Sequence, residues 1–260
     1  MPPLPPIHLC LMQPVGDVES LALLDPLRYW RWQLRRMGAQ VSVARNRLRH
    51  EAVNFVFGAH RGFDPALIRR HTCLFVNLEP LEAGGATAPG YLELLASSAV
   101  IDCDPLNVGV YASDVQDVPI APILHAPYLQ WADSPALQER PIDLLCIGAL
   151  NERQAAWVQR IESLGHPVAL FDSPLFGEER DAFIRQSKAV LLVHPHEGAR
   201  FEQALAAHCL SLGTPVISER GANTAPHAAY EDCVLWLQGP AELEQFFSED
   251  FGSPAYFDVV

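Results

Sequence analysis

Residues 188–219 read KAVLLVHPHEGARFEQALAAHCLSLGTPVISE, and this stretch decides the fold. An apolar run at 189–195 is followed by a polar turn, a helical pattern at 200–212, a Gly-Thr-Pro turn and a second apolar run at 215–219. This order predicts a β-α-β crossover between two parallel strands. The polar turn follows the carboxyl end of a strand, which is where open α/β sheets bind their ligands. The stretch therefore predicts both a fold class and the position of a site.

The same alternation extends through the second half of the chain. Strands are predicted at 143–149, 167–171 and 233–237, and helices at 151–164, 177–187 and 240–248. Because the strands are almost continuously apolar, we expect a mostly parallel sheet covered by helices on both faces.

The first half has a similar pattern without sequence similarity to the second. Its predicted elements are strands at 7–13, 40–44, 54–58, 73–79, 99–103 and 119–124, and helices at 18–37, 64–70 and 90–97. A proline-containing stretch without clear periodicity, 126–142, separates the halves. We therefore predict an α/β protein with two Rossmann-like, doubly wound domains, residues 1–132 and 140–260, and a cleft between them.

Composition narrows the class of function. Lys and Arg total 18 against 31 Asp and Glu, a net charge of −13, which disfavours general binding to nucleic acid or anionic membranes. Six scattered cysteines without a CxxC pair indicate reduced thiols in a reducing compartment. The first residues do not read as a signal peptide, and no apolar run reaches about 18 residues. We expect a cytoplasmic protein without a membrane span.

The segment Gly148-Ala-Leu-Asn151-Glu-Arg153 is the first candidate for binding chemistry. A strand ends at the glycine and a helix starts near Asn151, so free amides and the helix dipole favour an anion. The planar guanidinium of Arg153 suits a diphosphate. The alternative is a solvated surface arginine with a carboxylate neighbour. No GxGxxG motif is present, which disfavours a redox role for this fold.

The turn after the strand at 189–195 carries the second set of candidates. Glu202 can accept the vicinal hydroxyls of a ribose, and Arg200 can neutralise a leaving phosphate. His194 and His196 alternate along the chain and face opposite ways, and no third ligand stands at zinc-type spacing, so no metal site is predicted. Each histidine has the alternative of a purely structural role. The predicted binding set of this turn and the next strand end is His194, His196, Glu197, Arg200, Phe201, Glu202 and Glu219.

The first half offers polar residues at three predicted strand ends: Asp17, His60 and Glu79. His60 is the best candidate for a general base, because imidazole titrates near neutral pH. A structural role for His60 is an equal alternative, and Asp17 and Glu79 are weaker candidates. Asp102 and Asp104 flank an apolar segment and suit caps or turns.

Five segments together resemble a known family: NFVFGAH, FVNLEPL, IDCDPLNVGVY, DLLCIGALNER and RDAFIRQSKAVLLVHPHEGARFEQALAAHCLSLGTPVISE. In this order they are similar to bacterial GT-B-type glycosyltransferases related to glycosyltransferase families 1 and 4. The resemblance implies a UDP- or GDP-linked sugar donor held by the second domain. It also implies a small-molecule, glycan or peptide acceptor against the first, and no cofactor or metal. Arg153 matches the arginine that approaches phosphate in that family, and Lys188 is a further candidate.

The chain departs from the family at one motif. Many retaining members have two glutamates, with seven residues between them, ahead of the Gly-Thr-Pro turn, and those places hold Arg200 and His208. Three functions stay open: a glycosyltransferase, a catalytically silent GT-B-like nucleotide-binding or partner subunit, and an epimerase or other nucleotide-sugar enzyme.

Overall fold

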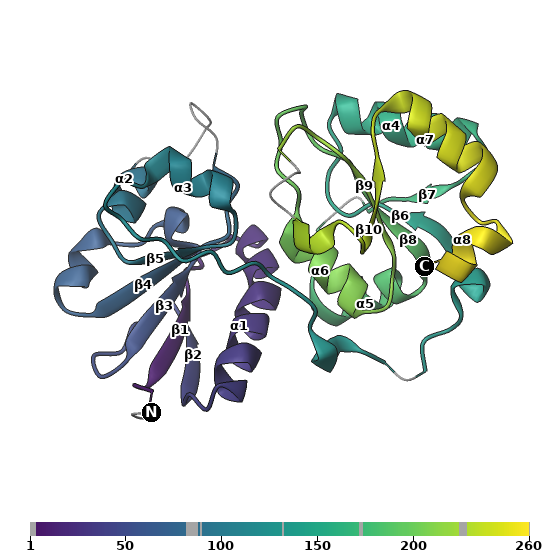
Figure 1. Ribbon diagram of the computed structural model, residues 1–260. Helices are drawn as coiled ribbons and strands as arrows, with labels where there is room; N and C mark the ends of the chain where they lie inside the picture. Colours follow the sequence, from purple (N-terminus) through teal and green to yellow (C-terminus); the bar gives the residue numbers. More distant parts are fainter. Residues whose placement is uncertain are drawn as a thin grey trace. The chain divides into compact units, whose positions relative to one another are not determined.

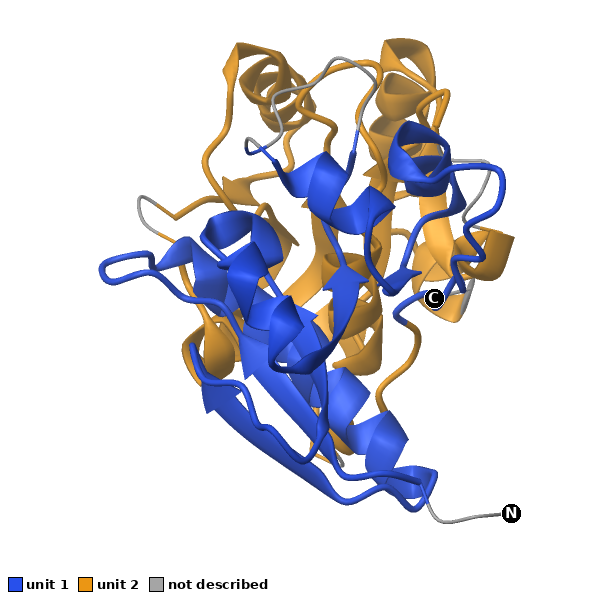
Figure 2. Cartoon of the chain, turned by 90° about the vertical axis from the view of Figure 1, so that its left-hand side faces the viewer, with its two compact units in different colours: residues 1–123 blue, residues 124–260 orange. Residues whose placement is uncertain are grey.

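The computed structural model describes residues 4–81, 88, 90–131, 133–171, 174–223 and 228–259. The chain divides into two compact units, Met1–Ile123 and Leu124–Val260, which Figure 2 shows in blue and orange. The stretch 126–142, which separates the two halves of the sequence pattern, belongs to the second unit.

The first unit contains a parallel five-stranded sheet in the order β2-β1-β3-β4-β5 (Figure 1). Its strands are β1 (Ile7–Leu11), β2 (Val41–Arg45), β3 (Val53–Phe57), β4 (Thr72–Asn77) and β5 (Val100–Asp102). Its helices are η1 (Glu19–Leu23), α1 (Leu24–Arg36), η2 (Ala59–Arg61), η3 (Pro65–Arg69), α2 (Tyr91–Ala96) and α3 (Pro105–Tyr111).

Helices cover both faces of this sheet, as the continuously apolar strands require. On one face, Leu27 and Leu34 of α1 pack with Leu9 of β1. On the other face, Leu95 of α2 joins Phe75 of β4 in a second cluster. The doubly wound arrangement places every strand's carboxyl end at one edge of the sheet, where the loops meet.

The second unit repeats this architecture with the strand order β10-β9-β8-β6-β7, again all parallel. Its strands are β6 (Ile142–Leu145), β7 (Val168–Ala169), β8 (Ser187–Leu192), β9 (Val216–Glu219) and β10 (Val234–Leu237). Its helices are η4 (Pro127–Leu129), η5 (Leu137–Glu139), α4 (Glu152–Ser163), α5 (Gly177–Arg185), α6 (Gln203–Ser211), η6 (Ala228–Tyr230), α7 (Pro240–Gln245), η7 (Phe246–Asp250) and α8 (Pro254–Val259). Figure 1 shows α4 and α7 on one face and α5 and α6 on the other. The α/β class and the two parallel sheets predicted from the sequence are confirmed.

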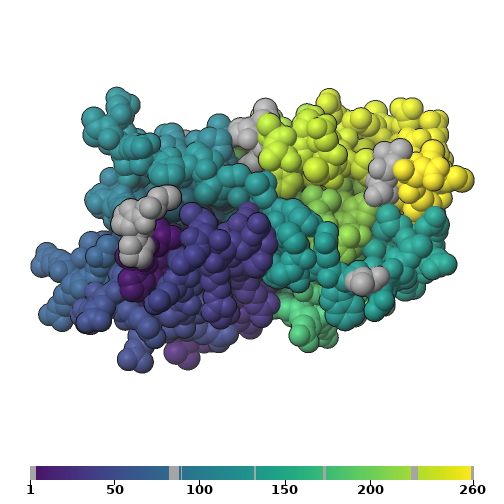
Figure 3. Space-filling model, turned by 60° about the horizontal axis from the view of Figure 1, so that its bottom comes forward, coloured from purple at the N-terminus to yellow at the C-terminus, as the bar shows by residue number. Residues whose placement is uncertain are grey.

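Most residues of 124–131 and 133–140 are exposed or half-buried on the second unit, within the teal part of the colour range of Figure 3, and this segment is anchored at both ends. Near its start, the amide of Ala126 donates to Ser211 Oγ at 2.8 Å. At its end, the buried guanidinium of Arg140 donates to Ser187 O, Gly213 O and Thr214 Oγ1, each at 2.9 Å. The stretch that lacks a sequence period contains only the short helices η4 and η5 among its described residues, and side-chain hydrogen bonds hold its two ends.

Some predicted elements are wrong. Residues 119–124 form no strand, and only one bridge joins Ile120 to Asp102. Pro119 and Pro122 explain this, because proline cannot donate to a ladder. The predicted helix 18–37 is split into η1 and α1. Two α-helices were missed: α3, where Asp104 caps the first turn and Pro105 follows it, and α8.

Candidate functional site

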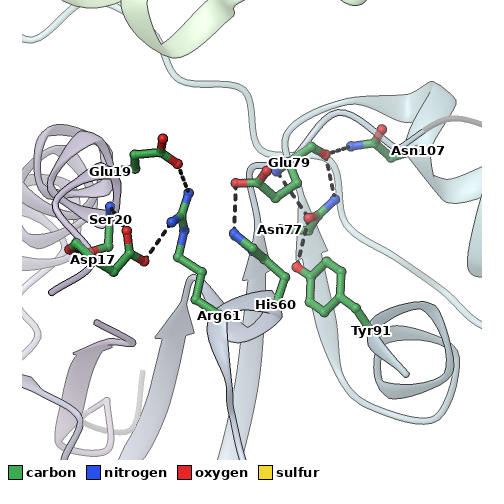
Figure 4. A network of polar contacts seen from close by, with 9 residues as sticks. All are labelled: Asp17, Glu19, Ser20, His60, Arg61, Asn77, Glu79, Tyr91 and Asn107. Atoms are coloured by element: carbon green, nitrogen blue, oxygen red, sulfur yellow. Dashed lines mark hydrogen bonds and ion pairs between the residues drawn. The ribbon is translucent and has the colours of Figure 1, made fainter. Parts of the chain in front are cut away.

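The carboxyl edge of the first sheet brings together Asp17, His60 and Glu79, the three polar residues predicted at strand ends. Figure 4 shows them in one network: His60 faces Glu79, and the neighbouring Arg61 reaches toward Asp17. The distances are 3.4 Å from His60 Nε2 to Glu79 Oε1 and 2.7 Å from Arg61 to Asp17 Oδ2. The loops after β1, β3 and β4 supply these residues, so the parallel topology is what makes them neighbours.

A close backbone approach positions His60. Gly58 has φ 70°, which favours glycine, and a Cβ atom there would lie 3.3 Å from the backbone oxygen of Met12 and 2.8 Å from Leu23 Cδ1, so another residue would be strained and would displace the Leu23 side chain. The chain then turns into η2, which carries His60 and Arg61. The ring of His60 packs edge-on to Tyr91, with 5.5 Å between centroids.

His60 is enclosed but lacks a strong hydrogen bond to the protein. Its side chain is 14% exposed, and the 3.4 Å contact to Glu79 does not meet hydrogen-bond geometry. Burial lowers the pKa of His60, and the neighbouring Glu79 carboxylate opposes that effect. A neutral imidazole at pH 7 with a carboxylate beside it is able to accept a proton from a hydroxyl group.

Asp17 forms an ion pair with Arg61 and does not contact His60 through any hydrogen bond that the structure shows. The hydrogen bond from Arg61 holds the pKa of Asp17 below its usual value, and Glu19 approaches the same guanidinium at 3.8 Å. The side chain of Asp17 also accepts from the amide of Ser20 at 3.3 Å. Asp17 thus fixes the loop after β1 beside His60, and it is a weaker candidate for a base.

In the second unit, the first turn of α4 is tied to the loop after β8. Three of its side chains donate to three consecutive carbonyls: Gln154 to Val193 at 2.8 Å, Arg153 to His194 at 2.6 Å and Asn151 to Pro195 at 2.8 Å. Asn151 and Gln154 also form a reciprocal capping box. Gly148, with φ 105°, makes the turn that leads from β6 into this helix.

Arg153 is the centre of this arrangement. Both of its terminal nitrogens contact the carboxylate of Glu219, the last residue of β9, whose side chain is 9% exposed. That bond raises the pKa of Arg153. Glu219 also accepts from the His194 amide at 3.2 Å. Arg153 therefore has a carboxylate neighbour, as its alternative interpretation supposed, and it joins α4, β8 and β9.

The two histidines of the loop after β8 have opposite environments, as their alternation predicts. His194 is 4% exposed and its Nε2 has no hydrogen-bond partner, while His196 is exposed. A Cβ atom on Gly221 would lie 3.3 Å from the His194 ring, so the loop after β9 passes close to it. Burial lowers the pKa of His194. Of the binding residues predicted in this loop and at the start of α6, His196, Glu197 and Glu202 are exposed and Arg200 is half-buried.

Two predicted donor residues lie elsewhere. Lys188 is near the amino end of β8, opposite to the loop, and its Nζ contacts Asp143 Oδ1 at 2.5 Å. Phe201 is a core residue that packs edge-on against Tyr230 and Trp236. Lys188 does not join the group around Arg153 because it lies at the other end of β8, and the ring of Phe201 is buried in the core of the second unit.

A set of buried polar residues lies behind the first site: Asn77, Tyr91, Asp102, Asn107 and Tyr111. From the sequence, Asp102 was expected only as a cap or turn residue, and the other four were missed. The only available signal was polar side chains inside apolar segments, as in FVNLE and IDCDPLNVGVY. Among the residues with described positions, no cluster of three or more His, Cys, Asp or Glu side chains is arranged to bind a metal ion.

Two parallel Rossmann-like units of this kind define the GT-B fold of glycosyltransferases, and the chain has that fold. It is similar to the crystal structure of AviGT4, a glycosyltransferase involved in avilamycin A biosynthesis, with a TM-score of 0.59 and 11% identity over 95% of this chain and 89% of that one. It is also similar to an α1,3-fucosyltransferase, with a TM-score of 0.58 and 12% identity over 98% and 81%. Neither a protein-family profile nor a curated protein sequence matches the chain. In the part of the chain that the structure describes, no helix is long and apolar enough to cross a bilayer.

Proposed function

We propose that this protein is a glycosyltransferase that moves a sugar from a UDP- or GDP-linked donor to a hydroxyl group of a small-molecule, glycan or peptide acceptor, without a metal cofactor. The observation that carries the proposal is the facing pair of His60 and Glu79 at the carboxyl edge of the first sheet. The GT-B fold supports the same reaction class. We also propose a cytoplasmic location, because all six cysteines are free thiols.

In this proposal His60 takes the proton of the acceptor hydroxyl. The resulting oxygen nucleophile attacks the anomeric carbon of the donor, and the bond from that carbon to the diphosphate breaks. Glu79, 3.4 Å from His60, stabilises the imidazolium that forms. The proton stays on His60 until the product leaves, and the diphosphate carries away the bonding electron pair.

The donor is assigned to the carboxyl edge of the second sheet. Glu202 is exposed at the start of α6, where its carboxylate can accept the hydroxyls of a ribose. Arg200 and the amides at the start of α4 are the candidates to neutralise the diphosphate. Arg153 has a revised role: its contacts with Glu219 and His194 make it the support of this edge rather than a free cation.

A catalytically silent nucleotide-binding or partner subunit is the second candidate, and two observations favour it. The charge of Arg153 is balanced within the protein by Glu219. His208, in the place of the second glutamate of many retaining enzymes, is buried against Asp181 at 2.7 Å.

A donor screen followed by a transfer assay separates the two candidates. A nucleotide sugar present at a hundred times its dissociation constant should stabilise the protein by about 2.7 kcal/mol in thermal unfolding. With the stabilising donor, sugar transfer supports the enzyme, and binding without turnover on a broad acceptor panel supports the silent subunit. If transfer occurs, His60→Ala should lower kcat by about 10²- to 10⁴-fold while nucleotide binding is retained.

A further inference from the structure

Asp102, the last residue of β5, carries a carboxylate in the interior of the first unit. The residue has no exposed surface and pairs in register with Asn77 of β4. Four groups donate to its oxygens: Asn77 Nδ2 (2.8 Å), the Asp104 amide (3.0 Å), Asn107 Nδ2 (2.9 Å) and the Tyr111 hydroxyl (3.1 Å). Burial raises the pKa of Asp102, but four donors suit an acceptor-only carboxylate.

Asp102 determines where the backbone of Glu79 lies. Asn77, held by Asp102 Oδ2, donates to Glu79 O at 3.2 Å and accepts from the Glu79 amide at 3.2 Å. Asn107, held by Asp102 Oδ1, donates to the same carbonyl at 2.9 Å. Figure 4 shows both asparagines converging on Glu79, whose side chain then points toward His60. Two hydrogen-bonded routes therefore run from one buried anion to the carboxylate-bearing residue.

The same anion also supports the other member of the pair. Tyr91 donates its hydroxyl to Asn77 Oδ1 at 2.9 Å, and its ring packs edge-on against His60. Without the Asp102 carboxylate, Asn77 would lose the hydrogen bond that fixes its side chain. Tyr91, which donates to Asn77 and packs against the His60 ring, would then be less firmly held. A buried polar network of this kind is rigid only when all of its members are satisfied.

We propose that Asp102 is the positioning residue that holds Glu79 and His60 face to face. It does not contact His60, and it acts through Asn77, Asn107 and Tyr91. The use of this pair as a base rests on the proposed function, but the positioning itself is a property of the free protein. It is therefore testable without a substrate.

The test is the titration of His60, followed by its Cε1–H resonance in NMR spectra of the full chain. Wild type is compared with Asp102→Asn, Glu79→Gln and the double variant. Because Glu79 raises the pKa of His60, Glu79→Gln should lower that pKa further. If Asp102 holds Glu79 in place, Asp102→Asn should lower it by a similar amount. Arg61 and Asp17, the other charges that act on His60, are unchanged in all four proteins.

The double variant decides how Asp102 acts. If Asp102 acts through Glu79, His60 should have the same pKa in the double variant as in Glu79→Gln alone. Once the Glu79 carboxylate has been removed, the loss of Asp102 has no further effect on His60. Additive shifts would mean a direct field of Asp102 on His60 and would overturn the proposal. An unchanged pKa of His60 in Asp102→Asn would overturn it as well.

Asn54→Ala is the matched control. Asn54 is also fully buried and hydrogen-bonded in this unit, to Arg49, Ala52 and Thr72, but it lies near the amino end of β3. The Asn54→Ala substitution should destabilise the fold and leave the titration of His60 unchanged. Should Asp102→Asn fail to fold, Asn107→Ala removes one of the two routes and keeps the anion. It should lower the pKa of His60 by a smaller amount, and no shift there would overturn the proposal.

The NMR titration tests the positioning role of Asp102, and the assay of sugar transfer tests the proposed function, so a negative result in one does not decide the other. If no transfer is found with any donor, the proposed function is lost and the NMR comparison still decides the role of Asp102. If transfer is found and the NMR shifts are absent, only the positioning role is lost.

Discussion

Both terminal nitrogens of Arg153, in the first turn of α4, donate to the carboxylate of Glu219 at the end of β9. The two residues are 66 positions apart in sequence. The guanidinium of Arg153 also donates to the carbonyl of His194. Helix α4, the loop after β8 and strand β9 are therefore joined at the carboxyl edge of the second sheet, to which we assign the proposed donor. Removing one partner of a largely buried ion pair destabilises the fold, because the other charge stays buried without a partner that offsets its desolvation cost.

We expect Arg153→Ala to reduce the free energy of unfolding by about 1–3 kcal/mol, since Glu219 and a carbonyl both lose a charged donor. Arg160→Ala is the matched control, because the Arg160–Glu244 pair is 51% and 42% exposed and should contribute less than about 1 kcal/mol. Urea unfolding measures both. The double variant Arg153→Ala/Glu219→Ala should lose less than the sum of the single variants, and strict additivity would contradict the coupling.

The pH dependence of transfer should report His60. Burial holds the pKa of His60 below its ordinary value of 6.5, so the imidazole stays neutral and active to a lower pH than free histidine. The acid limb of kcat/KM should therefore lie below about pH 6.5, and Glu79→Gln should move it to still lower pH, because the group that raises the pKa of His60 is gone. An acid limb that does not respond to Glu79→Gln would assign the base elsewhere.

Arg140 should be a major contributor to the stability of the second unit. It is 4% exposed, and its guanidinium supplies hydrogen bonds to Ser187, Gly213 and Thr214. Arg140→Ala should lower the free energy of unfolding by about 2–4 kcal/mol, because these buried acceptors lose their donor. Arg185→Ala is the control: its guanidinium lies 4.3 Å over the exposed ring of Trp131, a contact of about 0.5–1 kcal/mol. Equal losses in the two variants would refute the assignment.

A buried cluster between α5 and α6 should make stability depend on pH. Burial disfavours the Asp181 carboxylate, but bonds with His208 (2.7 Å) and Arg180 (2.9 Å) outweigh it and hold the pKa of Asp181 below 3.8. A carboxyl group whose pKa is lower in the folded state stabilises above its unfolded pKa, and this contribution is lost as the pH falls through the folded value. Wild type should exceed Asp181→Asn in urea midpoint at pH 6, and the gap should close below about pH 4. A gap of constant size from pH 6 to pH 3 would contradict this.

The class of fold was predictable because it depends on local patterns. Apolar runs separated by amphipathic segments identify parallel strands and their covering helices, and each of the ten strands in the described part of the chain overlaps a strand predicted from this signal. The two-residue β7 also falls within the predicted 167–171. Residues 119–124 were misassigned because apolar content alone does not distinguish a strand from an extended segment whose prolines prevent pairing.

The sequence by itself determined two parallel α/β units and the strand ends at which polar loops lie, because periodicity and turn residues are properties of neighbouring positions. Only the tertiary structure decided that Arg153 meets Glu219, that Lys188 meets Asp143, and that Asp102 meets Asn77 behind Glu79. Such pairings join residues 25 to 66 positions apart. They depend on strand order and on which face of the sheet each side chain occupies, and a single sequence carries no local signal for either.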